Sequence, residues 1–219
     1  DGLYGLFWQN DIPVDWLVAE LLTTENIRRY KLICLPVPLI VDDAVVAILK
    51  DYVHQGGVLL CEASPGLRAA NGWVNPAIPP AAMQELFGSR ELSRRQTDQP
   101  PELTVDWAER EWIFTADRTV STLSPLTARS IGNWPDGSCA ATLNSYGAGQ
   151  AFLIGTYLGC AYRAGKSEIL RDFIWQMALQ AGCRIPCQLT GCKEKVSVRC
   201  LADRDTKMIV LINHGGQDE

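Results

Sequence analysis

Cys61 is the first residue in this sequence that could carry covalent chemistry. It follows a run of four mostly apolar residues, as a nucleophile at the end of a buried strand would. A nucleophilic thiol needs a neighbouring imidazole and a sharp strand-to-helix turn with small residues on both sides. Only His54 and His214 could supply the imidazole, and the thiol is flanked by Leu60 and Glu62. We therefore expect Cys61 to be a buried structural residue, and an enzyme that uses Cys61 is kept as an alternative.

A second segment resembles a phosphate-binding loop without matching it. Residues 159–167 read GCAYRAGKS, whereas the loop requires G-x-x-x-x-G-K-[ST]. Glycine would have to stand where Cys160 does, and register matters because consecutive backbone N–H groups wrap the phosphates. Lys166 and Ser167 are more simply the start of a helix. We expect no nucleotide and no other cofactor.

The spacing of the cysteines near the C-terminal end does not match that of a structural zinc site. Structural zinc sites use pairs of the form C-x₂₋₄-C. The spacing here is wider, at Cys183, Cys187, Cys192 and Cys200. We therefore expect no bound metal.

Residues 31–63 should form the element that positions any ligand site. KLICLP and GVLLCEA are continuous apolar runs, typical of strands buried on both faces. Between them a helix starts at Asp42 or Asp43 and stops at Gly56. This strand–helix–strand unit predicts a parallel sheet, whose ligands bind beyond the carboxyl ends of the strands. Here that rim would contain the candidate binding residues Pro36, Glu62 and Ser64.

The rest of the chain continues the α/β pattern as far as residue 185. Residues 64–80 are rich in Pro, Gly and Asn and predict a long loop. Further helices are expected at residues 81–88 and 167–182, the second capped by Ser167. Strands are expected at 102–107, 111–116, 118–123, 139–146 and 150–158, with a polar connector at 93–102. After Pro186, alternating residues at 195–202 and 207–213 predict a hairpin.

Composition excludes several classes of protein. The 219 residues carry a net charge of −5, which disfavours a nucleic-acid partner. The longest apolar run, residues 33–41, is interrupted by prolines and is too short for a membrane helix. We also expect no signal peptide, because no basic segment followed by an apolar stretch opens the chain. Two of the eight cysteines, Cys34 and Cys61, lie inside apolar runs, so we expect a reduced, cytoplasmic protein.

Four stretches together resemble one family. YKLICLP (30–36), residues 42–66, residues 136–159 and a hairpin ending in VLINH are similar to the second and third domains of the glycoside hydrolase family 42 β-galactosidases. The resemblance implies a flavodoxin-like, class I glutamine amidotransferase-like trimerisation domain at residues 1–185. It also implies the start of a small β domain at 186–219. The catalytic glutamates of the family lie in a barrel that would precede Asp1.

The resemblance conflicts with the local pattern near the start of the chain. Residues 13–24 alone would predict a helix that begins at a proline. The family implies instead a strand at residues 12–18 and the end of a helix at 3–8, and the content of Ile, Val and Pro favours this strand. It further implies that the first strand of the domain is missing here. We therefore expect an open position in the sheet, filled by another segment or another copy.

Taken together, these features predict a non-catalytic accessory module. We expect it to form a homo-oligomer, a trimer in the parent enzyme, and to lie beside the catalytic barrel, where it shapes access to the active site. The alternatives are a small amidotransferase-like enzyme that uses Cys61 and a carbohydrate-binding module. The second alternative rests on the seven tryptophans, whose rings stack on sugars but serve more often in cores and subunit contacts.

Overall fold

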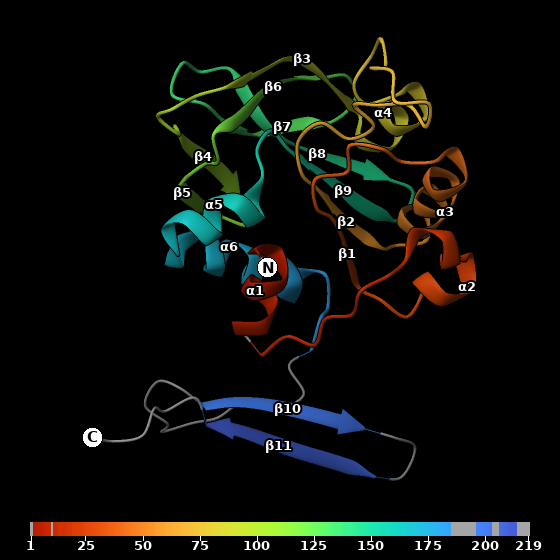
Figure 1. Ribbon diagram of the computed structural model, residues 1–219, viewed down its shortest axis with the longest axis vertical. Coiled ribbons are helices and arrows are strands. Elements are labelled where there is room, and N and C mark those ends of the chain that lie inside the picture. The colour runs from red at the N-terminus through yellow and green to blue at the C-terminus, as the bar shows by residue number, and fades with distance from the viewer. Residues whose placement is uncertain (1, 10, 185–195, 203–205, 214–219) are drawn as a thin grey trace.

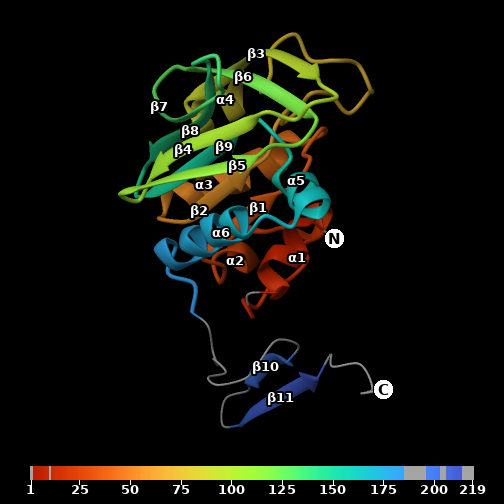
Figure 2. The same ribbon diagram turned by 90° about the vertical axis from the view of Figure 1, so that its left-hand side faces the viewer.

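The computed structural model describes residues 2–9, 11–184, 196–202 and 206–213. Its centre is a seven-stranded sheet with helices on both faces (Figures 1 and 2). In spatial order the strands are β1 (Leu32–Leu35), β2 (Val58–Cys61), β9 (Gly149–Ile154), β8 (Cys139–Tyr146), β7 (Arg129–Asn133), β4 (Glu102–Trp107) and β5 (Arg110–Thr115).

The sheet is mixed, and the expectation of a parallel sheet is correct for one half only. Strands β1, β2 and β9 are parallel. From β9 onward each neighbour is antiparallel, through β8, β7, β4 and β5. The switch occurs because β8 and β9 are joined by a tight turn at Gly147, which has a φ of 62°. Such a short connection can only join antiparallel strands.

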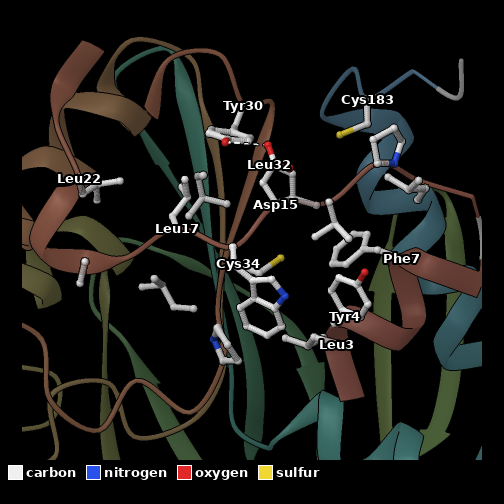
Figure 3. A pocket seen from close by; sticks show the side chains of 18 of the residues that line it. Leu3, Tyr4, Phe7, Asp15, Leu17, Leu22, Tyr30, Leu32, Cys34 and Cys183 are labelled. Atoms are coloured by element: carbon white, nitrogen blue, oxygen red, sulfur yellow. Dashed lines mark hydrogen bonds between the residues drawn. The ribbon is translucent and has the colours of Figure 1, made fainter. Parts of the chain in front are cut away.

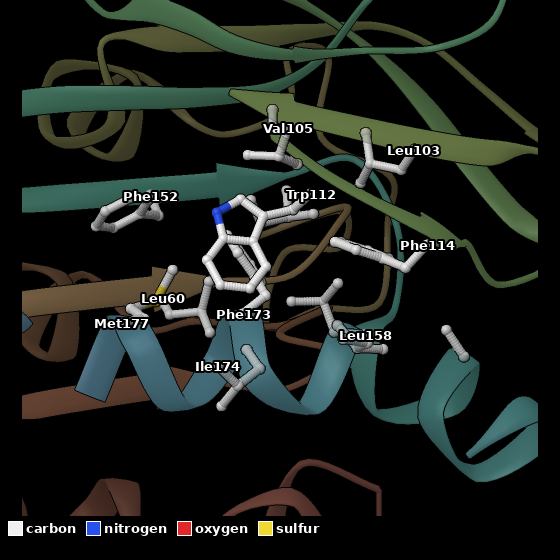
Figure 4. Close-up of a cluster of buried hydrophobic side chains, with 14 of the residues drawn as sticks. Leu60, Leu103, Val105, Trp112, Phe114, Phe152, Leu158, Phe173, Ile174 and Met177 are labelled. Carbon is white, nitrogen blue, oxygen red and sulfur yellow. The ribbon is translucent and has the colours of Figure 1, made fainter. Parts of the chain in front are cut away.

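Three helices cover one face of the sheet: α1 (Gly2–Gln9), α5 (Leu158–Gly165) and α6 (Glu168–Gln180). Ser167 caps α6 as expected, since its Oγ accepts a hydrogen bond from the Leu170 N–H at 3.3 Å. The phosphate-loop-like segment becomes α5 and the cap of α6. Phe173 of α6 lies among the aromatic rings of the antiparallel half, with centroids 5.9 Å from Trp107 and 5.7 Å from Trp112 (Figure 4).

The opposite face carries α2 (Thr24–Ile27), α3 (Asp43–His54) and α4 (Ala81–Phe87). The short helix η1 (Ala19–Leu21) precedes α2 along the chain. The side chains of successive strand residues point alternately to the two faces of the sheet. Leu59 packs in the cluster under α3 and α4, whereas Leu60 packs in the cluster under α6. Both are fully buried, which explains the continuous apolar run of β2.

A separate two-stranded ribbon forms from β3 (Ser89–Gln96) and β6 (Thr119–Pro125). The predicted polar connector at 93–102 is therefore partly wrong, because residues 93–96 belong to β3. Most of β3 is exposed, so its polar side chains meet solvent. Strand β7 and helix α5 also lacked a clear pattern in the sequence.

Residues 12–18 are neither the strand nor the helix that was expected. They form no regular element, and the helices after them are the short η1 and α2. A strand requires a hydrogen-bonded neighbour, and the nearest sheet strand, β1, is separated from this segment by a cavity. The expected helix end at residues 3–8 is confirmed by α1.

Past residue 195, β10 (Val196–Ala202) pairs antiparallel with β11 (Lys207–Asn213). Arg199 of β10 lies over the ring of Trp8, 3.5 Å from its centroid, and forms an ion pair with Asp11. The β10–β11 hairpin thus contacts the end of α1. Among the described residues, no helix has the length and apolar character needed to cross a membrane.

Candidate functional site

Glu62 lies at the predicted rim but is buried instead of solvated. It directly follows β2 and is 1% exposed. One carboxylate oxygen accepts a hydrogen bond from the Val37 N–H at 3.0 Å, and the other accepts one from the Gly159 N–H at 2.8 Å. Gly159 is in the first turn of α5, where free N–H groups favour a carboxylate. Glu62 therefore joins the loop after β1 to the start of α5.

The environment of Glu62 favours its neutral form. Burial raises the pKa of its carboxyl to about 7, while the N–H donors of Gly159 and Val37 oppose that rise. The negative charge of Asp117 adds a smaller increase. Near neutral pH a proton can therefore move on or off a group that holds two loops together.

Ser64 occupies the sharp turn that the sequence had associated with Cys61. Its φ is 63°, a left-handed conformation that is uncommon for a residue other than glycine, and it is completely buried. Its backbone N–H donates to Glu91 Oε1, and its hydroxyl lies 3.4 Å from Glu91 Oε2. Ser121 Oγ also donates to that oxygen at 3.1 Å. The strained turn is thus fixed by a carboxylate of β3.

Cys61 itself is built as a core residue. It is fully buried at the end of β2, and its thiol donates to the Glu62 carbonyl at 3.3 Å. Burial raises the pKa of this thiol well above its ordinary value, and nearby carboxylates raise it further. His54 lies at the end of α3, where its ring meets Tyr146 edge-on. The prediction that Cys61 has a structural role is consistent with this geometry, since a reactive cysteine needs a lowered pKa.

Pro36 lies on a different feature, a cavity of about 300 Å³ beside β1 (Figure 3). The structure therefore separates the three predicted rim residues: Glu62 and Ser64 are buried in the carboxyl edge of the sheet, and Pro36 lines the cavity. The turn at Ser64 was not foreseen from the sequence. The pattern SPG at 64–66 was the available signal, because Gly66 also has a positive φ of 63°.

Two of the seven tryptophans gather around one ring: Trp8 and Trp16 each stack with Tyr4, with ring centroids 5.7 Å apart in both pairs. Trp107, Trp112 and Trp134 are buried in the core. Trp73 and Trp16 are 76% and 71% exposed, but they belong to different loops, at 64–80 and at 12–18. Within the described ranges, no group of three or more Cys, His, Asp or Glu side chains is placed to hold a metal ion.

Comparison with known proteins gives a consistent result. β-Galactosidase GalA of Bacillus licheniformis is 26% identical over an alignment that covers 96% of this chain and 30% of that protein. The chain spans about 30% of the length of the curated relatives it matches.

Solved structures share the fold. The β-galactosidase of Bacillus circulans sp. alkalophilus aligns with a TM-score of 0.81 at 18% identity, over 96% of this chain and 30% of that one. A cytoplasmic protein of Salmonella typhimurium LT2 aligns with a TM-score of 0.63 at 17% identity, over 83% of this chain and 86% of that one. A family model described as the β-galactosidase trimerisation domain matches residues 2–183. This chain therefore belongs to the β-galactosidase trimerisation domain family.

Proposed function

We propose that this chain is the non-catalytic accessory module of a β-galactosidase of glycoside hydrolase family 42. Its role is to hold subunits together and to shape the approach to the active site of a neighbouring catalytic barrel. The observation that carries this proposal is the family match over residues 2–183, almost the whole α/β unit. Hydrolysis is assigned to the barrel, since a retaining glycosidase needs two carboxylates facing the sugar and both Glu62 and Glu91 are engaged with the protein's own N–H and hydroxyl groups.

The loop at residues 64–80 is an exposed apolar part of the surface that could make a subunit contact. It presents Trp73 at 76% and Val74 at 58% exposure. Exposed aromatic side chains are enriched where proteins associate, because they bury a large area with little loss of side-chain freedom. We therefore assign Trp73 to the contact with a neighbouring subunit or barrel.

Light scattering coupled to size exclusion tests the proposal on the full 219-residue chain. We expect a mass three times the 24.2 kDa of one chain at high concentration. Trp73→Ala should shift the mass toward the monomer, whereas Leu126→Ala, which removes another exposed apolar side chain outside this loop, should not. A strict monomer at every concentration would contradict self-association, and equal effects of both variants would contradict the assignment of Trp73.

We further propose a division into an α/β unit at residues 1–185 with a flavodoxin-like, amidotransferase-like relationship, and the start of a β domain at 186–219. The end of the family match at residue 183 supports this division. The binding role of Pro36, Glu62 and Ser64 stays a prediction. For Glu62 and Ser64, burial supports a role in positioning the rim loops.

We also propose that the protein is cytoplasmic. The six cysteines in the described part of the chain are free thiols, and Cys61 is packed in the core. The Salmonella protein of similar fold is described as cytoplasmic. A fold of this size with a full apolar core does not need disulfides.

A further inference from the structure

Val37 lies in the loop that follows β1 and has an uncommon backbone conformation. Its φ is 45°, a left-handed value that is strained for a β-branched residue, so its surroundings must hold it there. Its N–H donates to Glu62 Oε2 at 3.0 Å, and its carbonyl accepts from the Leu39 N–H at 2.8 Å. The conformation of this loop, residues 36–41, therefore depends on an acceptor that Glu62 supplies.

The same loop supports the exposed turn at residues 68–74, which carries Trp73. Gly66 and Arg68 donate their N–H groups to the carbonyls of Pro38 and Leu39, respectively, at 2.8 Å in each case. Across the turn, Arg68 forms an antiparallel bridge with the residue that follows Trp73. A continuous set of backbone hydrogen bonds thus leads from the buried carboxylate through residues 37–39 to the exposed turn.

The carboxylate of Glu62 has unequal partners on its two sides. On the α5 side, the backbone N–H groups of Gly159 and Leu158 hydrogen-bond to it, and the start of a helix favours negative charge. On the loop side, the donor to Oε2 is Val37. A proton on this carboxyl is therefore best placed on Oε2. A protonated oxygen is itself a hydrogen-bond donor, so the Val37 N–H would then face another donor.

The other titratable groups around Glu62 do not compete for this proton. Burial raises the pKa of the thiols of Cys34 on β1, Cys61 on β2 and Cys160 on α5, so these thiols stay uncharged near neutral pH. Asp117, which precedes β6, contributes negative charge that favours a proton on Glu62. Glu62 is the carboxyl of this cluster whose pKa, about 7, lies where cells and buffers can titrate it.

We propose that Glu62 is a proton-controlled support for the loop at 36–41. When the carboxyl gains a proton from solvent, the Val37 N–H loses its acceptor, and the loop and the turn at 68–74 loosen while Glu62 stays bonded to α5. Because N–H donors lower the pKa of Glu62, loss of one donor raises it further. The loosened form therefore binds the proton more tightly and is favoured as the pH falls through 7. Unfolding of the whole chain has the opposite dependence, since the unfolded carboxyl has a pKa near 4.5.

Amide hydrogen exchange measured by NMR on the 219-residue chain tests this proposal. Each exchange rate is divided into the intrinsic rate at the same pH, which gives a protection factor. From pH 6 to pH 8 we expect the protection factors of Val37, Gly66 and Arg68 to rise about five- to tenfold, because a hydrogen bond to a charged group is regained. The amide of Phe152, in the core of β9, exchanges by unfolding of the whole chain, and its protection should fall over the same range.

Two variants separate Glu62 from other causes of pH dependence. Glu62→Gln carries no titrating proton, so the protection of Val37, Gly66 and Arg68 should not change between pH 6 and pH 8. Glu111→Gln, which alters an exposed carboxylate of β5, should keep the wild-type rise. The wild-type rates decide the test by themselves if Glu62→Gln does not fold. Equal protection of Val37 at both pH values, or a rise at Val37 that Gly66 and Arg68 do not share, would overturn the proposal.

The proposal does not depend on the proposed function, because loop protection is measured within one chain. If subunits associate through Trp73, the loosened turn should weaken that association at pH 6. A mass by light scattering that is the same at pH 6 and pH 8, while the protection of Gly66 and Arg68 changes, would contradict the assignment of Trp73 and leave the role of Glu62 in place.

Discussion

Replacing Glu62 by glutamine should make folding stability less sensitive to pH. The pKa of this carboxyl is raised from 4.5 to about 7 in the folded protein, so the folded state binds a proton that the unfolded chain has already lost. Stability contributed by this proton is therefore complete below pH 4.5 and disappears as the pH rises through 7. Each pKa unit corresponds to about 1.4 kcal/mol, so the wild-type chain should lose about 3 kcal/mol over this window through Glu62.

The N–H groups of Val37 and Gly159 determine whether Glu62→Gln is more or less stable than wild type at pH 5 and at pH 8. A glutamine can accept from only one of Val37 and Gly159 with its oxygen, and its NH₂ group then faces the other N–H. This mismatch should make Glu62→Gln about 1 kcal/mol less stable than wild type at pH 5. At pH 8 the variant should be about 2 kcal/mol more stable, because it avoids a buried negative charge.

Urea unfolding followed by circular dichroism at pH 5, 6, 7 and 8 measures this crossover. Glu111→Gln, which changes an exposed carboxylate of β5, is the matched control and should follow the wild-type curve. Glu91 also has a raised pKa, but it is present in every variant and cancels in the difference. If the free-energy difference between Glu62→Gln and wild type is the same at pH 5 and pH 8, the assigned environment of Glu62 is wrong.

Three further results are expected. Phe173→Ala should lower the free energy of unfolding by about 3–5 kcal/mol, and Phe173→Leu by about 1, because the ring is fully buried among Trp107, Trp112 and Phe114; equal losses in urea titrations would disprove this packing. In alkylation followed by mass spectrometry, Cys61 of the native protein should react at least about a hundredfold more slowly than in urea. Rapid labelling of the native protein would instead support the hypothesis of an enzyme that uses Cys61. The purified chain should release no nitrophenol from nitrophenyl β-galactoside above a buffer blank, and measurable turnover would refute its accessory role.

The elements that were predicted correctly are those whose local pattern and burial agree. The run GVLLC and the amphipathic pattern of α3 identify β2 and its partner helix because both faces of that strand are packed. The direction of pairing could not be predicted in the same way. A run buried on both faces is equally compatible with a parallel or an antiparallel neighbour. The direction of pairing is decided instead by the connections, such as the tight turn at Gly147 that makes β8 and β9 antiparallel.

The candidate site was predictable in position but not in conformation. Pro36, Glu62 and Ser64 do follow β1 and β2, as the apolar runs indicated. The burial of Glu62, however, depends on Gly159, which is 97 residues away. The strain at Ser64 depends on Glu91 in a strand whose polar residues, such as Arg94 and Arg95, had suggested a loop. The predicted strand at residues 12–18 is absent for a related reason: β propensity does not produce a strand without a hydrogen-bonded neighbour.

The contact between Arg199 and the first helix ties together two parts of the chain that lie nearly 190 residues apart. Closing so long a loop costs conformational entropy, which is offset only when the rest of the fold is formed. We therefore expect the Arg199 contact to form last in folding and to break first under denaturant. Mechanical tension applied at the C-terminal side would accordingly reach the N-terminal helix before it reached the central sheet. A change in the β10–β11 hairpin would therefore alter the surroundings of α1 while the central sheet stays folded.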